Sequence, residues 1–240
     1  MQLRKWKELP KFMRTREVRK YYNIVNKRRA SLMVKRLFDI VVASIMLAVL
    51  ALPMLIIAIL IKYDSRGPVF FRQERVTQYG RIFKIYKFRT MVVNANELGA
   101  SVTVDNDRRI TRMGKLLRKI RADEFPQLFN ILAGDMTLVG TRPEVPEYVK
   151  QYSKEMYATL LLPAGLTSRT SIAYKAEDKI LGNAANPDKA YVEEVLPAKM
   201  KYNLEALRKF GFAEDCRVLW DTFESVVGSE RLSVTKSRRR

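Results

Sequence analysis

The chain has 240 residues, with 45 Lys/Arg against 25 Asp/Glu and a formal net charge of +20. It contains no histidine and one cysteine, Cys216, which excludes histidine bases, histidine metal sites and a disulfide within the chain. Any chemistry must therefore use carboxylates, lysines and arginines. We interpret Cys216 as a small core residue rather than a reactive thiol.

A long uncharged segment occupies residues 40–61. It is long enough to cross a bilayer, because roughly 20 apolar residues at about 1.5 Å each cover a ~30 Å hydrocarbon core. Basic residues flank both of its ends, however, and positive charge marks the cytoplasmic side. If Pro53 breaks the helix, the arms Ile40–Leu52 and Pro53–Ile61 form a hairpin that enters one leaflet and returns. A tilted single span kinked at Pro53 is the alternative.

Positive charge is concentrated at both ends of the chain. Residues 1–36 contain 13 Lys/Arg against two glutamates, and residues 238–240 are all arginine. Beside an apolar anchor, such clusters indicate attraction to anionic lipid headgroups. The aromatic side chains interleaved with the first cluster suit the same interface, and they are Trp6, Phe12, Tyr21 and Tyr22. Nucleic-acid binding is the rival interpretation, which we disfavour because no recognisable nucleic-acid module accompanies the charge.

Beyond the apolar segment, the pattern predicts a β-hairpin. Residues 69–73 and 81–88 have the pattern of strands, and Gln78-Tyr79-Gly80 between them is a turn signal. The hairpin would deliver Lys87 and Arg89 together at the end of its second strand. Both are cations suited to a phosphate, and a solvated basic edge is the alternative.

An amphipathic basic helix is predicted over residues 110–120, with apolar residues at helical spacing and Arg118 on another face. It runs into Asp123-Glu124-Phe125-Pro126, whose proline places the two carboxylates near a helix junction. Neighbouring cations lower the pKa values of these acids, while desolvation and mutual repulsion raise them. Ionised, they could hold Mg²⁺ or attack phosphorus, because this metal takes carboxylate and phosphate oxygens. An ordinary pair of surface acids is the alternative.

After an apolar stripe over residues 125–132, we expect a glycine-bounded turn over residues 134–144. This turn presents Arg142 beside Pro143, which fixes the backbone and would preorganise the guanidinium for a phosphate or nucleotide. Further along, residues 193–207 and 215–227 have near-helical apolar spacing and predict two packed helices.

Five motifs follow one another along the chain. They are Lys35-Arg36-Leu37-Phe38-Asp39, Gly67-Pro68-Val69-Phe70-Phe71-Arg72-Gln73-Glu74-Arg75, Lys87-Phe88-Arg89-Thr90-Met91, Asp123-Glu124 and Val139-Gly140-Thr141-Arg142-Pro143. In this order they resemble the bacterial sugar transferases, the monotopic polyprenyl-phosphate phosphoglycosyl transferases. The resemblance runs from residue 34 to residue 150 and, more loosely, to residue 228. Two positions depart from it, since Leu52 and Thr141 stand where the family often has serine and proline.

The resemblance implies transfer of a sugar 1-phosphate from a UDP-sugar to polyprenyl (undecaprenyl) phosphate, with release of UMP. It implies that Asp123 is a nucleophile forming a covalent aspartyl-phosphosugar intermediate. Glu124 would support Mg²⁺ or the incoming phosphate, so the two carboxylates are the expected metal ligands. The basic positions expected to bind the phosphates and the nucleotide are Lys87, Arg89, Arg118 and Arg142. Sugar specificity is expected beyond residue 150, where Glu177 and Asp178 are candidate contacts and a solvated loop is the alternative.

We therefore predict an α+β, mostly helical domain, anchored monotopically by a re-entrant helical hairpin and amphipathic interfacial helices. The expected divisions are a basic N-terminal arm (1–34), a membrane hairpin (35–62), a cytoplasmic catalytic domain (63–228) and a basic tail (229–240). The protein would act at the cytoplasmic face of the bacterial inner membrane, among anionic lipids and without a nucleic-acid partner, to initiate exopolysaccharide or glycoconjugate synthesis. A non-catalytic, membrane-tethered basic scaffold that binds anionic lipid or nucleic acid is the alternative.

Overall fold

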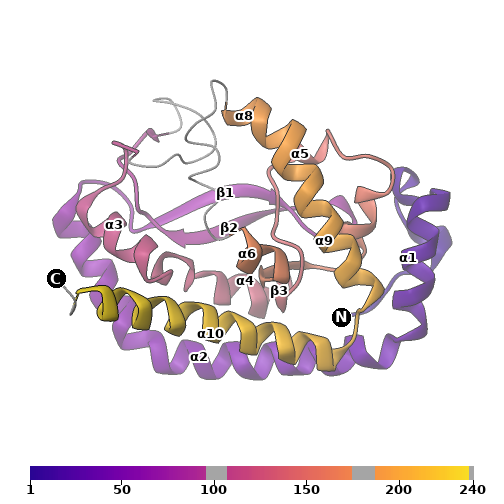
Figure 1. Ribbon diagram of the computed structural model, residues 1–240, viewed down its shortest axis with the longest axis horizontal. Coiled ribbons are helices and arrows are strands. Elements are labelled where there is room, and N and C mark those ends of the chain that lie inside the picture. Colours follow the sequence, from indigo (N-terminus) through magenta and orange to yellow (C-terminus); the bar gives the residue numbers. More distant parts are fainter. Residues whose placement is uncertain (96–106, 175–186, 238–240) are drawn as a thin grey trace.

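The computed structural model describes residues 1–95, 107–174 and 187–237. Across these residues the protein is mostly helical with two small sheets, which confirms the predicted α+β class. Helix α2 (Arg29–Asp64) runs along the lower edge of the molecule beside α10 (Phe212–Ser237) (Figure 1). Within the described ranges, α2 is the one helix that is long and apolar enough to cross a membrane.

Helix α2 is continuous and contains Pro53, so it is not divided into the two helices predicted from the sequence. A proline removes only its own amide donor, and α2 keeps buried contacts on both sides of it, through Ala43 before it and Met54 and Ile61 after it. In Figure 1 the ribbon bends upward near its C-terminal end rather than reversing through a loop. Its exposed apolar side chains include Ile45, Val49, Leu52, Leu55, Ile56 and Ile59.

The predicted β-hairpin is confirmed. Strand β1 (Phe70–Val76) pairs antiparallel with β2 (Ile82–Phe88), and the turn between them contains the short helix η3 (Gln78–Gly80). Tyr79 and Gly80 both have positive φ there, which lets the chain reverse within a few residues.

The second sheet pairs β3 (Met136–Val139) in parallel with β4 (Ala164–Thr167), where the sequence was expected to form a glycine-bounded turn. All four residues of β3 are buried, and Thr137 and Val139 are β-branched, so this short segment is a core strand rather than a turn. A Cβ atom on Gly165 would collide with the backbone of Gly140, so the two segments approach as closely as glycine permits. This pairing fixes the direction in which the chain leaves β3 towards Arg142.

Buried polar contacts attach the start of α2 to β3. Lys35 Nζ donates to the carbonyl oxygen of Val139 at 2.8 Å and to Asp215 Oδ2 at 2.7 Å. Asp39 accepts hydrogen bonds from the Thr137 hydroxyl at 2.6 Å and from the next backbone amide at 3.1 Å. Buried charges persist only when paired, so these contacts fix the position of α2 on the domain.

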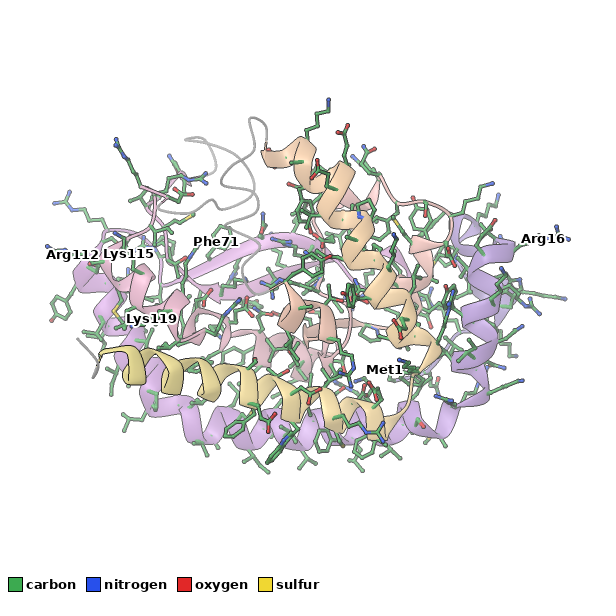
Figure 2. All side chains as sticks on the ribbon, in the orientation of Figure 1. Met1, Arg16, Phe71, Arg112, Lys115 and Lys119 are labelled. Atoms are coloured by element: carbon green, nitrogen blue, oxygen red, sulfur yellow. The ribbon has the colours of Figure 1, made fainter. Side chains whose placement is uncertain are left out.

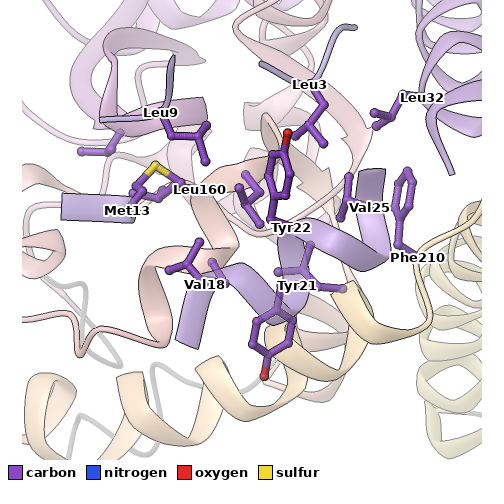
Figure 3. Close-up of a cluster of buried hydrophobic side chains, with 14 residues drawn as sticks. Leu3, Leu9, Met13, Val18, Tyr21, Tyr22, Val25, Leu32, Leu160 and Phe210 are labelled. Atoms are coloured by element: carbon purple, nitrogen blue, oxygen red, sulfur yellow. The ribbon is translucent and has the colours of Figure 1, made fainter. Parts of the chain in front are cut away.

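The residues before α2 form η1 (Trp6–Glu8), η2 (Lys11–Met13) and α1 (Arg16–Lys27). Tyr21 and Tyr22, predicted to lie at a lipid interface, are instead buried in a protein core, because apolar residues of α1 recur at helical spacing and pack inward (Figure 3). This cluster also contains Leu3, Leu9, Leu160 and Phe210. The basic arm therefore packs against the rest of the protein.

Shorter elements complete the domain. They are α3 (Arg112–Lys119), η5 (Ala122–Glu124), α4 (Gln127–Ala133), α5 (Pro146–Val149), η6 (Met156–Leu161), α6 (Arg169–Ala173), α8 (Pro187–Ala190), the π-helix η7 (Tyr191–Val195) and α9 (Leu196–Arg208). The helices predicted over residues 110–120, 193–207 and 215–227 are thus present.

Helix α10 differs in packing from its prediction as a core helix. Val218 is buried, but Trp220 and Phe223 are exposed, so only one face of the helix packs against the domain. Cys216 lies on the same helix and is exposed, which corrects its assignment to the core.

Candidate active site

One cavity of about 750 Å³ contains the residues singled out from the sequence. Its walls include residues of the hairpin β1–β2, of α3 and of α9, and Figure 1 shows these two helices towards opposite ends of the hairpin. All six predicted site residues line it: Lys87, Arg89, Arg118, Asp123, Glu124 and Arg142. Glu177 and Asp178 lie outside the described residues.

The two adjacent carboxylates lie on a single helical turn between α3 and α4. Arg121 adopts a left-handed conformation with φ +58° and ends the path of α3. The turn η5 follows, and α4 begins after Pro126. Ala122 and Leu128, each 1% exposed, anchor the turn from both sides. The predicted helix junction is therefore present, and it is packed tightly.

Glu124 is held by two cations from different parts of the chain. Its Oε1 lies 2.9 Å from Lys87 Nζ and 2.6 Å from Arg142 Nη2, while Arg142 Nη1 lies 3.4 Å from Oε2. Burial opposes ionisation, but the charges and hydrogen bonds of Arg142 and Lys87 outweigh it and hold the pKa of Glu124 well below its usual value. Glu124 is therefore a permanent anion at neutral pH.

Asp123 has the opposite environment. Its side chain is buried, and its carboxylate accepts no hydrogen bond from the described part of the chain. Burial raises its pKa, the charge of Lys87 lowers it, and the neighbouring Glu124 raises it further, so that the net shift is upward. Two adjacent carboxylates with pKa values moved apart are typical of residues with different chemical roles.

Arg89 lines the cavity, but its guanidinium contacts the C-terminal end of α2. It donates to the carbonyl oxygen of Arg66 at 2.5 Å, and to the carbonyl and hydroxyl oxygens of Ser65 at 2.7 and 2.9 Å. Gly67 has φ +121°, and a Cβ atom there would collide with the Arg89 side chain. Arg89 thus connects the end of α2 to the strand that carries Lys87.

The segment containing Arg142 is supported by residues that sequence reasoning did not select. Arg75 donates to the carbonyl oxygen of Pro143 at 3.0 Å. The Tyr191 hydroxyl donates to Glu144 Oε1 at 2.6 Å and accepts from Lys199 at 2.9 Å. The acidic residue directly after Arg142-Pro143 was the signal in the sequence that could have pointed to Glu144. Its partners Tyr191 and Lys199 lie on η7 and α9, far along the chain, and no sequence pattern pointed to them.

The same carboxylates are the candidate metal ligands. The described residues contain no group of three or more His, Cys, Asp or Glu side chains placed to hold a metal ion. Glu124 is engaged by two cations, whereas Asp123 keeps free lone pairs. Mg²⁺ commonly binds one or two carboxylates together with substrate phosphates, so this donor set fits it only when phosphate oxygens complete the shell.

A family model for the bacterial sugar transferases matches residues 30–229. The chain belongs to this family. It is 36% identical to the UDP-N-acetylgalactosamine-undecaprenyl-phosphate N-acetylgalactosaminephosphotransferase of Aeromonas hydrophila, over 81% of this chain and 44% of that protein. It is 33% identical to the UDP-glucose:undecaprenyl-phosphate glucose-1-phosphate transferase of Klebsiella pneumoniae, over 78% of this chain and 39% of that protein. The chain thus spans less than half the length of these two relatives.

A shorter relative is also similar. A putative undecaprenyl-phosphate N-acetylgalactosaminyl 1-phosphate transferase of Bacillus subtilis is 42% identical over 56% of this chain and 75% of that protein. The family resemblance drawn from the sequence motifs is therefore confirmed.

Arg89 provides a first prediction. Arg89→Lys removes the fork that reaches three acceptors, and we expect the free energy of unfolding in detergent to fall by roughly 1–3 kcal/mol, because the buried Arg89 side chain loses hydrogen bonds to partly buried acceptors. Thermal and denaturant unfolding measure this, with the exposed Arg112→Lys as the matched control. An unchanged stability for Arg89→Lys would contradict the role of Arg89 at the end of α2.

A second prediction concerns the titration of Asp123. Glu124→Gln removes a charge that raises the pKa of Asp123 and leaves Lys87 and Arg142 without their anion, so the pKa of Asp123 should fall. Carboxyl ¹³C NMR of protein labelled at aspartate measures the shift, and Asp123→Asn assigns the resonance. A pKa that stays constant or rises in the variant would show that the two carboxylates are not coupled in this way.

Proposed function

We propose that this protein transfers a sugar 1-phosphate from a UDP-sugar to polyprenyl (undecaprenyl) phosphate, with release of UMP, through a covalent intermediate on Asp123. The observation that carries the proposal is the unequal carboxylate pair: Glu124 is held by Lys87 and Arg142, while Asp123 lines the same cavity and accepts no hydrogen bond from the described residues. The names of the relatives from Aeromonas and Klebsiella supply the donor and acceptor classes.

The cations of the cavity suit the diphosphate of such a donor. Arg142 presents a planar fork, and Lys87 presents a compact charge, both beside Glu124. Arg118 donates through Nε to the Thr90 hydroxyl at 2.9 Å, which orients its guanidinium at the cavity wall. Because these groups are fixed before substrate arrives, they stabilise developing charge on the phosphoryl group without reorganisation.

The reaction then proceeds in two displacements. An Asp123 carboxylate oxygen attacks the phosphorus that carries the sugar, a new O–P bond forms, and the bond from that phosphorus to the UMP oxygen breaks, with the electron pair leaving on UMP. A polyprenyl phosphate oxygen next attacks the same phosphorus, and the bond to Asp123 breaks, which restores the carboxylate. A carboxylate nucleophile in this way divides one difficult displacement into two easier ones.

Asp123 and Glu124 would hold Mg²⁺ together with phosphate oxygens of the donor, and the ion would neutralise charge on the transferring phosphoryl group. The protein residues set the direction of attack. Glu124, fixed by two cations, keeps η5 in place, so that the neighbouring Asp123 points its unpartnered oxygens into the cavity.

We also propose that α2 enters the cytoplasmic leaflet of the bacterial inner membrane and returns, so that both of its ends lie on one side. Both ends contact the same domain. Asp39 bonds to β3 near the start, and at the far end Asp64 Oδ2 accepts from the Met113 amide of α3 at 3.0 Å. A helix crossing the bilayer would carry its two ends to opposite faces, about 30 Å apart.

Other surfaces support this placement at the membrane. Leu116 and Ile120 of the α3 region are exposed, and Figure 2 shows Arg112, Lys115 and Lys119 gathered at the same end of the molecule. Exposed apolar side chains beside cations are typical of an interfacial helix among anionic headgroups. The aromatic Trp220 and Phe223 of α10 are exposed, and α10 lies beside α2.

The nucleophile assignment gives a third prediction. Asp123→Asn keeps the size of the side chain but replaces a carboxylate by a weak nucleophile, and UMP release from UDP-sugars should fall by about a thousandfold or more. Purified protein with a panel of UDP-sugars, Mg²⁺ and undecaprenyl phosphate is the assay, and Glu74→Gln, an exposed acid on β1, is the control. Full turnover by Asp123→Asn would refute the covalent mechanism.

Topology gives a fourth prediction. With Cys216 replaced by serine, single cysteines at positions 5 and 235 should both react with an impermeant maleimide in inside-out vesicles and neither in right-side-out vesicles. Each position is compared with the same vesicles after solubilisation, which gives its full reactivity. Labelling of the two positions from opposite sides would establish a transmembrane span instead of a re-entrant helix.

A further inference from the structure

The cavity has two chemically different ends. On the α3 side its walls carry six cations against Asp123 and Glu124, and these cations are Lys87, Arg89, Arg118, Lys119, Arg121 and Arg142. On the α9 side the walls are aromatic or polar and largely uncharged, and they include Tyr148, Thr170, Ser171, Tyr174, Tyr191 and Asn203. In Figure 1, α3 and α9 lie towards opposite ends of the hairpin, so the two groups of lining residues come from different parts of the fold.

The charged groups at the α9 end offset one another. Lys199 Nζ lies 3.6 Å from Glu144 Oε1, and the Tyr191 hydroxyl bridges them, donating to Glu144 at 2.6 Å and accepting from Lys199 at 2.9 Å. All three side chains are buried. Arg75, at the border between the two ends, donates to Gln73 and to a backbone carbonyl. A diphosphate is therefore attracted to the α3 end, and the α9 end suits a neutral, polar part of the same ligand.

The side-chain amide nitrogen of Asn203, on α9, is a hydrogen-bond donor with a weak acceptor. Its side chain is only 5% exposed, and its Oδ1 accepts from the Thr170 hydroxyl at 2.7 Å. The contact of its amide nitrogen is with the sulfur of Met200 at 3.7 Å, and a thioether is a weak acceptor. Among the described residues this amide nitrogen therefore has no strong acceptor. A buried amide N–H in that position is destabilising unless a ligand supplies an oxygen.

The order of groups in the donor decides which neutral part fits. In a nucleoside diphosphate sugar, the sugar is bonded to the phosphorus that Asp123 attacks, whereas the nucleoside lies beyond the leaving phosphate. Arg142 contacts Glu124 beside the nucleophile, and Glu144, two residues further on, already belongs to the α9 end. The α9 end thus begins next to the reacting phosphorus, where the sugar is attached.

We propose that the α9 end of the cavity is the sugar subsite of the donor. The Asn203 amide donates to a hydroxyl or acyl oxygen of a pyranose sugar, and Thr170 is a positioning residue that orients the amide by occupying its oxygen. This inference rests on the proposed function, because it takes the donor to be a nucleoside diphosphate sugar.

Binding and turnover together test this subsite. Calorimetry on full-length Asp123→Asn protein, which binds without turnover, gives the dissociation constants of UDP and of four donors: UDP-glucose, UDP-galactose and their N-acetylated forms. The ratio between UDP and the best donor measures the contribution of the sugar. Asn203→Ala should reduce this ratio by about fivefold or more and flatten the preference among donors, because neutral hydrogen bonds to a buried partner are lost.

Matched variants exclude a general structural effect. Thr170→Val should flatten the preference less than Asn203→Ala, and Lys201→Ala, which removes an exposed side chain from the same helix, should leave the ratio unchanged. An unchanged ratio and preference in Asn203→Ala would overturn the sugar subsite, and equal weakening of UDP and every donor would assign the α9 end to the nucleoside. A different result would separate the subsite from the reaction. If the protein with Asp123 intact releases no UMP, while the ratio of dissociation constants still depends on Asn203, the sugar subsite stands and the proposed reaction fails.

Discussion

The ionic contact of Glu124 with Lys87 and Arg142 is the interaction on which the geometry of the site depends. Lys87 ends the β-hairpin, and Arg142 follows β3, so one carboxylate joins the two small sheets across the cavity. Removing one partner from a buried ionic contact lowers the free energy of unfolding by roughly 3–5 kcal/mol, because it leaves an uncompensated charge. Asp123 is buried and has no hydrogen-bonding partner among the described residues, and the proposed reaction rests on that inequality.

Helix α2 and the site are parts of one framework. Lys35 and Asp39 fix the start of α2 to β3, the strand that leads to Arg142. Arg89 fixes its far end to β2, the strand that carries Lys87. Each of the two cations that hold Glu124 therefore lies two or three residues along the chain from a residue that contacts α2 or its C-terminal end: Lys87 from Arg89, and Arg142 from Val139. Under the proposed function, this arrangement would bring a soluble diphosphate and a lipid-linked phosphate together at one depth relative to the headgroups.

Local patterns predicted the local features correctly. Period-two alternation around Gln78-Tyr79-Gly80 gave the hairpin, and Pro126 after two acids gave the helix junction. Predictions failed where distant partners decide the outcome. The segment around β3 has turn-like glycines, but pairing with β4 makes it a strand, and Tyr21 and Tyr22 look interfacial until α1 buries them. Strand and burial preferences depend on such tertiary partners more than on the local sequence.

The candidate site was predictable in membership but not in the roles of its members. Charge and motif order selected six residues, and all of them line one cavity. Nothing in the adjacent pair Asp123-Glu124 says which acid is held and which is left without a partner, because Lys87 and Arg142 lie far away in the chain. Likewise Asn203 and Thr170 meet only because α6 packs against α9. Such information is created by folding.

The most direct test of the inequality between the two carboxylates is mass spectrometry of the protein incubated with a UDP-sugar and no acceptor. We predict a mass increase equal to one sugar phosphate, mapped by peptide sequencing to Asp123 and discharged when undecaprenyl phosphate is added. An adduct mapped to Glu124, or no adduct while UMP is still released, would contradict this account.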